Sequence, residues 1–273
     1  MSLLEETKSL LRRHRIKPKK TLGQNFMVES QVFQKMVDYA SLDCDDTVLE
    51  IGAGLGFLTR FLSEKCKAVL AVEVDTRLAI ILREQLKDAP NVRIIEGDVL
   101  KTSVPSFNKV VSIPPYHVSS RLLLWLFGTD FDRAVLIFQK EFANRLVASV
   151  GSEDYGWLTV LTDYHVEVEP LDHVPKWTFY PQPKIDSVIV RLEPKNPRPY
   201  SLRNKELFKQ LLRSCFAKRN RKVKNAVQAY VKGFCNMSEE KSIRIVEALP
   251  FREKRVRQLA PEDFGVIADA LIQ

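Results

Sequence analysis

The stretch VLEIGAGLG, residues 48–56, decides the fold of this chain. Its first half is a run of aliphatic and β-branched side chains, which is typical of a buried strand in a parallel sheet. Its second half places three glycines, Gly52, Gly54 and Gly56, within five residues. Glycine lets a backbone turn sharply and approach a ligand closely because it has no Cβ atom. The stretch therefore predicts a strand, a ligand-binding turn and a following helix at residues 57–65, whose N-terminus favours negative charge.

The spacing of the glycines separates two classes of ligand. A dinucleotide fingerprint is G-x-G-x-x-G, whereas this chain has G-x-G-x-G with Glu50 two residues before the first glycine. The carboxylate of Glu50 would repel a pyrophosphate but would suit a cationic group. S-adenosylmethionine carries an amine and a sulfonium and has no phosphate, so it fits this turn better than a dinucleotide. A generic turn between a strand and a helix is the alternative interpretation of the stretch alone.

Short aliphatic segments alternate with helical ones through the first half of the chain. This alternation predicts an α/β fold, a Rossmann-like doubly wound sheet. We expect helices at residues 1–17, 31–40, 76–86 and 119–127, strands at residues 47–51, 68–74, 92–96, 109–112 and 134–138, and two later strands at residues 164–174 and 187–192.

Acidic residues stand at the ends of the first three predicted strands. They are Glu50, Glu73 and Asp98. Ligands of doubly wound sheets bind beyond the carboxyl ends of the strands. We expect Glu73 to accept hydrogen bonds from the two hydroxyls of a ribose, and Asp98 to accept one from the amine of an adenine. One such carboxylate alone could be a solvated loop residue, but three beside a glycine turn favour a nucleoside site.

The fourth predicted strand ends in Ile113, Pro114, Pro115 and Tyr116. The two prolines restrict the backbone and remove its N–H donors, which leaves carbonyl groups without local partners. The ring of Tyr116 offers a face on which a flat base can stack. A rigid turn with a core tyrosine is the alternative.

Basic residues are distributed unevenly. The formal net charge is +8, which indicates an anionic partner such as nucleic acid. Residues 12–20 form one basic stretch, and residues 213–224, which we predict to lie on one helix, form another without an acidic residue among its charges. A proline-rich linker at residues 194–199 divides the chain into a domain at residues 1–193, with a basic arm at 1–20, and a helical RNA-binding domain at 200–273. A solvated basic surface is the alternative for either stretch.

The four cysteines are Cys44, Cys66, Cys215 and Cys235. They form no C-x-x-C pair and no histidine cluster accompanies them, so we expect no metal and a reduced, cytoplasmic setting. The chain has no secretory signal and no apolar run of about 18 residues, so we expect no contact with a membrane.

Taken together, the motifs resemble those of the ribosomal RNA adenine N6-dimethyltransferases. The similar segments follow the order of that family and cover roughly residues 18–265. They are KTLGQNF at 20–26, the glycine turn, VEVD at 72–75, EGD at 96–98, FQKEFANRL at 138–146, FYPQPKIDS at 179–187 and RQLAPEDF at 257–264.

This resemblance implies a fold, a reaction and a set of site residues. It implies an enzyme that uses S-adenosylmethionine to place two methyl groups on N6 of each of two adjacent adenosines near the 3′ end of small-subunit ribosomal RNA, within the immature subunit. We expect the enzyme to be a monomer. The expected cofactor contacts are Gln24, Asn25, Phe26, Glu50, Gly52, Gly54, Glu73, Val74, Asp98, Val99 and Ile113. The expected catalytic residues are Ile113, Pro114 and Tyr116. The expected RNA contacts are Arg13, Arg15, Lys17, Lys19, Lys20, Lys140, Arg145, Lys184, Lys218, Arg219, Arg221, Lys222 and Lys224.

One position departs from the family pattern. The family motif after the fourth strand begins with Asn, which is followed by any residue, Pro and an aromatic residue, whereas this chain has Ile113 in the first place. The carbonyl of Pro114 can still accept a hydrogen bond from the target amine, but the side chain of Ile113 cannot. We therefore expect weakened methyl transfer with retained cofactor binding.

Three other functions remain open at this point. The first is a non-catalytic RNA-binding assembly factor, which Ile113 favours. The second is a methyltransferase of large-subunit RNA, and the basic helix expected at residues 216–225, together with the tail at residues 257–264, argues against it. The third is an NAD-dependent oxidoreductase, which the glycine spacing disfavours.

Overall fold

A computed structural model describes residues 1–234 and 239–272. The chain divides into two compact units. The first consists of Met1–Ala143 and Glu169–Pro194, and the second consists of Asn144–Val168 and the chain from Lys195 on. The chain passes from the first unit to the second for the last time between Pro194 and Lys195, within the linker that the prolines predicted. The segment Asn144–Val168, however, groups with the second unit, whereas the sequence placed it in the first domain.

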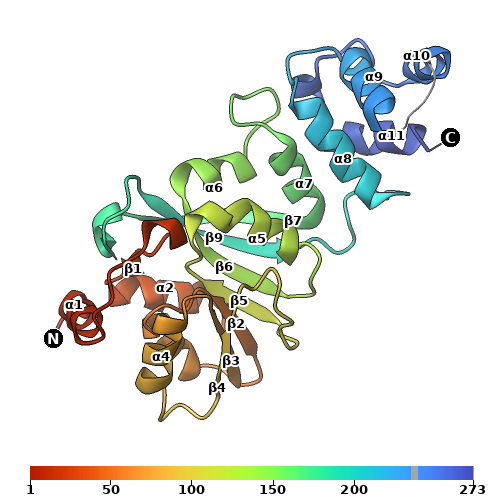
Figure 1. Ribbon diagram of the computed structural model, residues 1–273. Coiled ribbons are helices and arrows are strands. Elements are labelled where there is room, and N and C mark those ends of the chain that lie inside the picture. The colour runs from red at the N-terminus through yellow and green to blue at the C-terminus, as the bar shows by residue number, and fades with distance from the viewer. Residues whose placement is uncertain (235–238, 273) are drawn as a thin grey trace. The chain divides into compact units, whose positions relative to one another are not determined.

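The first unit is built on a mixed sheet with the order β4-β3-β2-β5-β6-β9-β7 in the part of the chain that the structure describes (Figure 1). Strands β2 to β6 run parallel to one another, and β9 pairs antiparallel with β6. The strands are β2 (Thr47–Ile51), β3 (Ala68–Glu73), β4 (Val92–Glu96), β5 (Lys109–Ser112), β6 (Arg133–Gln139), β7 (Val166–Val174) and β9 (Ser187–Pro194). The Rossmann-like doubly wound fold is thereby confirmed.

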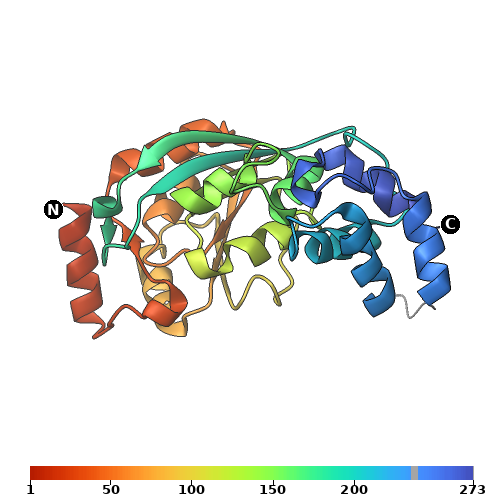
Figure 2. The same cartoon turned by 90° about the horizontal axis from the view of Figure 1, so that it is seen from above.

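Helices cover both faces of this sheet (Figure 2). Consecutive strand residues such as Val48 and Leu49 are both fully buried, and since successive side chains point to opposite faces, both faces must be covered. The helices from the N-terminus to residue 146, of which α1 stands apart from the sheet, are α1 (Leu3–Arg13), α2 (Ser30–Ala40), α3 (Phe57–Ser63), α4 (Thr76–Gln85), α5 (Ser119–Leu126) and α6 (Lys140–Leu146), with short 3-10 turns η1 (Lys20–Leu22), η2 (Tyr116–Val118) and η3 (Lys176–Thr178).

A two-stranded ribbon joins the N-terminal loop to the proline-rich loop. Strand β1 (Phe26–Met27) pairs antiparallel with β8 (Phe179–Tyr180), so that Phe26 lies opposite Tyr180 and Met27 lies opposite Phe179. Neither strand was predicted, because two-residue strands have no periodicity that a sequence can reveal.

In the residues that the structure describes, the regular elements of the second unit are helices apart from the start of β7. It contains α7 (Trp157–His165), α8 (Lys205–Phe216), α9 (Val223–Phe234), α10 (Glu239–Ala248), the 3-10 turn η4 (Val256–Gln258) and α11 (Pro261–Ala270). The buried Tyr155 donates a hydrogen bond from its hydroxyl to the carbonyl of Leu259 at 2.8 Å. This contact explains why residues 144–168 belong with these helices. Residues Tyr164 and His165 end α7 rather than beginning the strand that was predicted from residue 164.

No helix among residues 1–234 and 239–272 is long and apolar enough to cross a membrane. Within the same residues, no group of three or more His, Cys, Asp or Glu side chains could hold a metal ion. Cys235 lies outside the described residues.

Candidate cofactor and base-binding site

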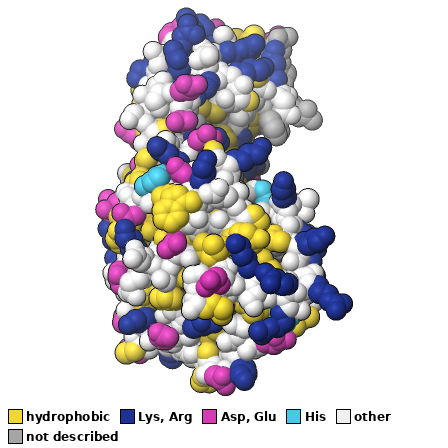
Figure 3. All heavy atoms as spheres, turned by 90° about the vertical axis from the view of Figure 1, so that its left-hand side faces the viewer, with side chains coloured by type: hydrophobic (Ala, Val, Ile, Leu, Met, Phe, Trp, Pro, Cys, Tyr) yellow, Lys and Arg dark blue, Asp and Glu magenta, His cyan; other side chains and the backbone are white. Residues whose placement is uncertain are grey.

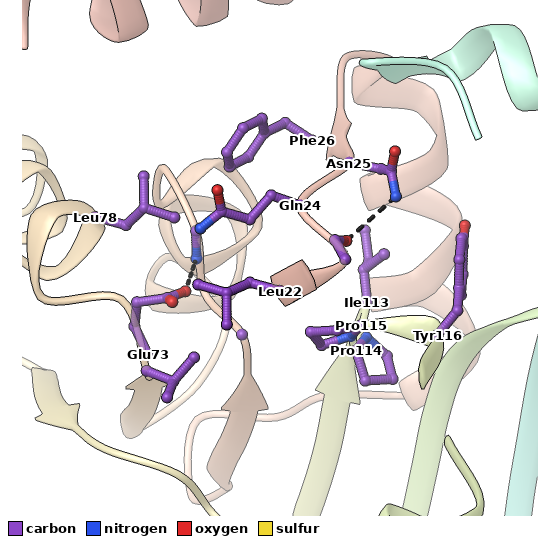
Figure 4. Close-up of a pocket in the computed structure, with 14 residues that line it drawn as sticks. Leu22, Gln24, Asn25, Phe26, Glu73, Leu78, Ile113, Pro114, Pro115 and Tyr116 are labelled. Carbon is purple, nitrogen blue, oxygen red and sulfur yellow. Dashed lines mark hydrogen bonds between the residues drawn. The ribbon is translucent and has the colours of Figure 1, made fainter. Parts of the chain in front are cut away.

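The candidate site lies at the carboxyl ends of β2, β3 and β5. The sheet order reverses its direction between β2 and β5, and such a switch point opens the crevice in which ligands of doubly wound sheets bind. A hollow there is lined by the N-terminal loop, the glycine turn, the end of β3 and residues 113–116 (Figure 4). Two neighbouring hollows share Gly52 with it, so the three together form one trough, which we call the cofactor trough.

The glycine turn has the backbone geometry that the sequence predicted. Gly52 and Gly54 have φ values of +76° and +60°, which residues with a Cβ atom rarely adopt. A Cβ atom on Gly52 would also lie 3.3 Å from Pro115. The turn is therefore packed closely against the proline segment that follows β5.

Glu73 ties the end of β3 to the glycine turn. Its carboxylate accepts hydrogen bonds from the backbone N–H of Gly54 at 2.8 Å and of Asp75 at 2.9 Å. Only 4% of Glu73 is exposed, and burial raises the pKa of its carboxyl. Each oxygen accepts one bond and keeps a second lone pair, so the carboxylate is held where a ribose could use it.

Glu50 is buried without a complete set of partners. Only 2% of Glu50 is exposed, and its Oε2 atom has no hydrogen-bond partner. The hydroxyl of Thr59 on α3 is buried and lacks a partner as well. Burial, with a smaller contribution from the charge of Glu73, raises the pKa of Glu50 to about 8. An unpartnered buried carboxyl beside a hollow fits a cationic amine, which is the group that S-adenosylmethionine would present there.

Asp98 and Val99 line the far end of the trough. Asp98 accepts a hydrogen bond from the N–H of Leu100 at 3.0 Å, which fixes its loop. Val74 lines the same end with its side chain, and it remains 49% exposed. The apolar side chains of Val74 and Val99 suit the faces of an adenine ring, and the carboxylate of Asp98 can accept a hydrogen bond from its amine.

Hydrogen bonds of polar side chains in the N-terminal loop hold this loop over the trough. The Gln24 side chain donates a hydrogen bond to Asp75 at 2.9 Å and accepts one from the N–H of Lys19 at 2.7 Å. Asn25 donates to the carbonyl of Gly23 at 3.2 Å. Gln24, Asn25 and Phe26 all line the trough (Figure 4), so these three predicted cofactor contacts lie together.

Tyr116 and the proline segment form the edge of the trough (Figure 4). The Tyr116 hydroxyl lies 2.8 Å from Oγ of Ser187, and burial raises the pKa of Tyr116 to about 12. The neutral ring contacts Phe179 edge-on, with ring centroids 6.4 Å apart. Ile113 also lines the trough and packs against the main hydrophobic core.

Phe179 and Thr59 are buried residues behind the site, next to Tyr116 and Glu50, and the sequence reasoning assigned no role to either. Phe179 belongs to the segment FYPQPKIDS, which resembles the family motif, but the resemblance was not used to assign a role to this residue. Nothing in the spacing of Thr59 indicated that its hydroxyl would be buried near Glu50.

The predicted basic helix at residues 213–224 is wrong. Helix α8 ends at Phe216 and α9 begins at Val223, so the charges lie at a helix end, a turn and a helix start. Backbone hydrogen bonds to the segment after α10 hold this turn. The N–H of Val223 donates to the carbonyl of Lys254 at 2.9 Å, and the N–H of Val256 donates to the carbonyl of Arg221 at 3.0 Å. These long-range backbone contacts override local helix propensity.

The predicted RNA contacts fall into two groups. Four of them have partners in the protein: Lys19 lies 4.0 Å from Asp75, Arg219 donates to the carbonyls of Ser152 and Glu153, and Lys222 and Lys224 both pair with Glu253 at 2.7 Å. The other nine are exposed and have no ion-pair partner among residues 1–234 and 239–272. They are Arg13, Arg15, Lys17, Lys20, Lys140, Arg145, Lys184, Lys218 and Arg221.

The fold and the trough define the class of the protein as an S-adenosylmethionine-dependent methyltransferase. The model of the ribosomal RNA adenine dimethylase family matches residues 15–262, and the chain belongs to this family. It is an enzyme that dimethylates adenine in ribosomal RNA, and S-adenosylmethionine is its methyl donor.

Relatives and solved structures agree with this membership. A probable ribosomal RNA small subunit methyltransferase A of Thermococcus kodakarensis is 39% identical over 96% of this chain and 93% of its own. The corresponding protein of Methanosarcina mazei is 37% identical over 97% and 96%. The crystal structure of a dimethyladenosine transferase from Plasmodium falciparum is similar with a TM-score of 0.77 and 30% identity, covering 89% of this chain and 95% of that one. The non-catalytic alternative is not favoured by these comparisons.

Proposed function

We propose that the enzyme dimethylates N6 of two adjacent adenosines near the 3′ end of small-subunit ribosomal RNA, and that it acts on the immature subunit, in the cytoplasm and as a monomer. The observation that carries the proposal is the convergence of Glu50, Glu73 and Asp98 on one trough that ends at Tyr116. The small-subunit relatives support the choice of RNA.

The bound cofactor supplies an electrophilic methyl group on a sulfonium. The chain has to hold the target base beside it. We assign this role to Tyr116, which lines the trough and whose ring rests edge-on against the buried Phe179, because an enzyme that modifies a base must take it out of its stack and place it against aromatic side chains. The hydrogen bond between Tyr116 and Ser187 fixes the tyrosine ring in this position.

The target amine is a weak nucleophile because its lone pair is delocalised into the adenine ring. A protein can favour attack by accepting hydrogen bonds from this amine. We assign the role of one acceptor to the carbonyl oxygen of Pro114. The proline residue itself has no backbone N–H group. Ile113 stands where a second acceptor would act, and we propose that its apolar side chain limits the rate of transfer.

The proposal is tested by single-turnover transfer of labelled methyl groups. Immature small subunits, mature small subunits and large subunits would each be mixed with the enzyme and labelled S-adenosylmethionine. We expect incorporation into immature small subunits to be at least tenfold faster than into the other two. Preferred labelling of large subunits would overturn the choice of RNA, and preferred labelling of mature small subunits would overturn the stage of assembly.

A further inference from the structure

Trp177 is exposed at the surface of the first unit. Its side chain is 60% exposed, and among the large apolar residues that the structure describes only Met1 is more exposed. A single exposed apolar side chain is common on protein surfaces, so the case for a partner depends on how the ring of Trp177 is held and on what surrounds it.

The backbone around Trp177 is held firmly. Thr178 is 2% exposed, its hydroxyl donates to the carbonyl of Pro175 at 2.7 Å, and its own carbonyl accepts from the N–H of Val28 at 2.8 Å. The N–H of Lys176 donates to Asp186 at 2.9 Å. The ring of Trp177 is therefore presented to solvent by a fixed turn, η3, and not by a loose loop.

The same turn leads to the residue that packs behind Tyr116 at the edge of the trough. Phe179 follows Trp177 by two residues, is 3% exposed and contacts Tyr116. Two residues span at most about 7 Å. A nucleotide that adjoins the target adenosine can therefore contact η3 while the target base lies against Tyr116.

The charges near η3 suit RNA. Lys176 and Lys184 are exposed and have no ion-pair partner among residues 1–234 and 239–272. Of the two nearby carboxylates, Asp172 pairs with Lys35 at 2.8 Å, whereas Asp186 lies 3.1 Å from the ring of His173 and accepts a hydrogen bond from the backbone N–H of Lys176 at 2.9 Å. On the face drawn in Figure 3, hydrophobic side chains are exposed with Lys and Arg side chains beside them. Aromatic rings combined with unpaired basic residues are what single-stranded nucleic acids bind.

We infer that Trp177 stacks on an unpaired base that neighbours the target adenosine, with Lys176 and Lys184 contacting the adjoining phosphates. The inference rests on the proposed function, because it supplies a second binding point for the same RNA. Single-stranded RNA is recognised largely by such stacking of splayed bases on aromatic side chains.

The test compares Trp177→Ala and Trp177→Phe with a matched control, Ile80→Ala, which truncates another exposed apolar side chain at 48% exposure on α4. The probe is an oligoribonucleotide that contains two adjacent adenosines flanked by unpaired nucleotides. Loss of one stacked base is expected to weaken its binding by roughly 5- to 100-fold. Trp177→Phe should retain most of the affinity, Ile80→Ala should leave it unchanged, and the Kd of S-adenosylmethionine should not change in any variant.

Two further readouts identify the partner. Quenching of tryptophan fluorescence by the oligoribonucleotide should occur in the wild-type protein and be lost in Trp177→Phe, although Trp125 and Trp157 remain. Unchanged oligoribonucleotide binding by Trp177→Ala would overturn the inference, and so would weakened binding to subunits without weakened binding to the oligoribonucleotide, since that result assigns Trp177 to a protein partner. Failure of the wild-type enzyme to methylate small subunits would refute the proposed function instead, and it would do so independently of the quenching result.

Discussion

The side chain of Gln24 donates a hydrogen bond to Asp75 across 51 residues of sequence, at 2.9 Å. This bond fastens the N-terminal loop to the end of β3, where Glu73 also lies. The guanidinium of Arg77 and the amide of Gln24 hold the pKa of Asp75 below its usual range, so the acceptor is ionised. A hydrogen bond to a charged acceptor is among the stronger kinds in proteins.

We expect Gln24→Ala to weaken the binding of S-adenosylmethionine by about tenfold, because the loop that covers the trough loses its fastening. Isothermal titration of the cofactor measures this change. Gln34→Ala removes another glutamine that bonds to an aspartate, Asp38, but does so on α2 away from the trough, and it should leave the Kd unchanged. Equal Kd values for wild type and Gln24→Ala would show that the loop closes without this bond.

Cofactor affinity should depend on pH through Glu50. Its pKa is raised to about 8, so the ionised fraction of the carboxyl in the free enzyme rises from pH 6 and reaches about one half at pH 8. The ionised form suits a cationic amine, and affinity should therefore rise with pH over this window, by up to about tenfold per pH unit. The groups around Glu50 are Thr59, which is neutral, and Glu73, whose charge acts in the same direction.

The control for this dependence is a ligand without the amine. 5′-Methylthioadenosine lacks the amino-acid part, so its affinity should not follow the ionisation of Glu50, and Glu50→Gln should abolish the pH slope for S-adenosylmethionine.

The stability of the folded protein should respond to pH in the opposite sense. Since the folded protein keeps a proton on Glu50 that the unfolded chain loses above about pH 4.5, stability should fall between pH 4.5 and pH 8, and less so in Glu50→Gln. A flat affinity profile would contradict the assignment of Glu50 to the amine.

Replacing Ile113 with asparagine should accelerate methyl transfer. One preorganised polar contact of this kind is worth roughly 10²–10³ in rate, and Ile113→Asn would restore an acceptor at the edge of the trough. Single-turnover transfer to immature small subunits measures the rate, and Ile113→Leu serves as an apolar control of similar size. No acceleration in Ile113→Asn, with the Kd of the cofactor unchanged, would refute our account of this position.

The basic residues of the second unit should differ in their effect on RNA binding. Lys218 and Arg221 are exposed without an ion-pair partner among the described residues, whereas Lys222 and Lys224 share Glu253. Lys218→Ala and Arg221→Ala should each weaken binding and reduce the slope of log K against log salt by about 1. Lys222→Ala should change the slope less, and Glu253→Gln should strengthen binding. Equal slopes for Lys218→Ala and Lys222→Ala would show that the pairing with Glu253 does not persist against RNA.

The sequence predicted the sheet well because its evidence was local. Aliphatic runs and a glycine turn specify strands, and the strands at 47–51, 92–96 and 109–112 agree with β2, β4 and β5 at both ends. The carboxylates at the ends of the strands also converge as predicted, since parallel strands bring their carboxyl ends to one edge.

The remaining features depend on contacts between distant segments. The turn at residues 217–222 replaces a predicted helix because it pairs with residues 254–257. Phe179, which contacts Tyr116, lies in β8, and β8 pairs with β1 through only two residues of each strand. The pairing of Lys222 and Lys224 with Glu253 joins residues about thirty positions apart. No local pattern carries this information.

The most direct test of the account is mass spectrometry of the ribosomal RNA after incubation of immature small subunits with the wild-type enzyme and isotope-labelled S-adenosylmethionine. We predict label on N6 of two adjacent adenosines near the 3′ end, two methyl groups on each, and loss of this label in Tyr116→Ala with cofactor binding intact. Label at other nucleotides, or unchanged labelling in Tyr116→Ala, would contradict the central claim that the trough and Tyr116 form one active site for this reaction.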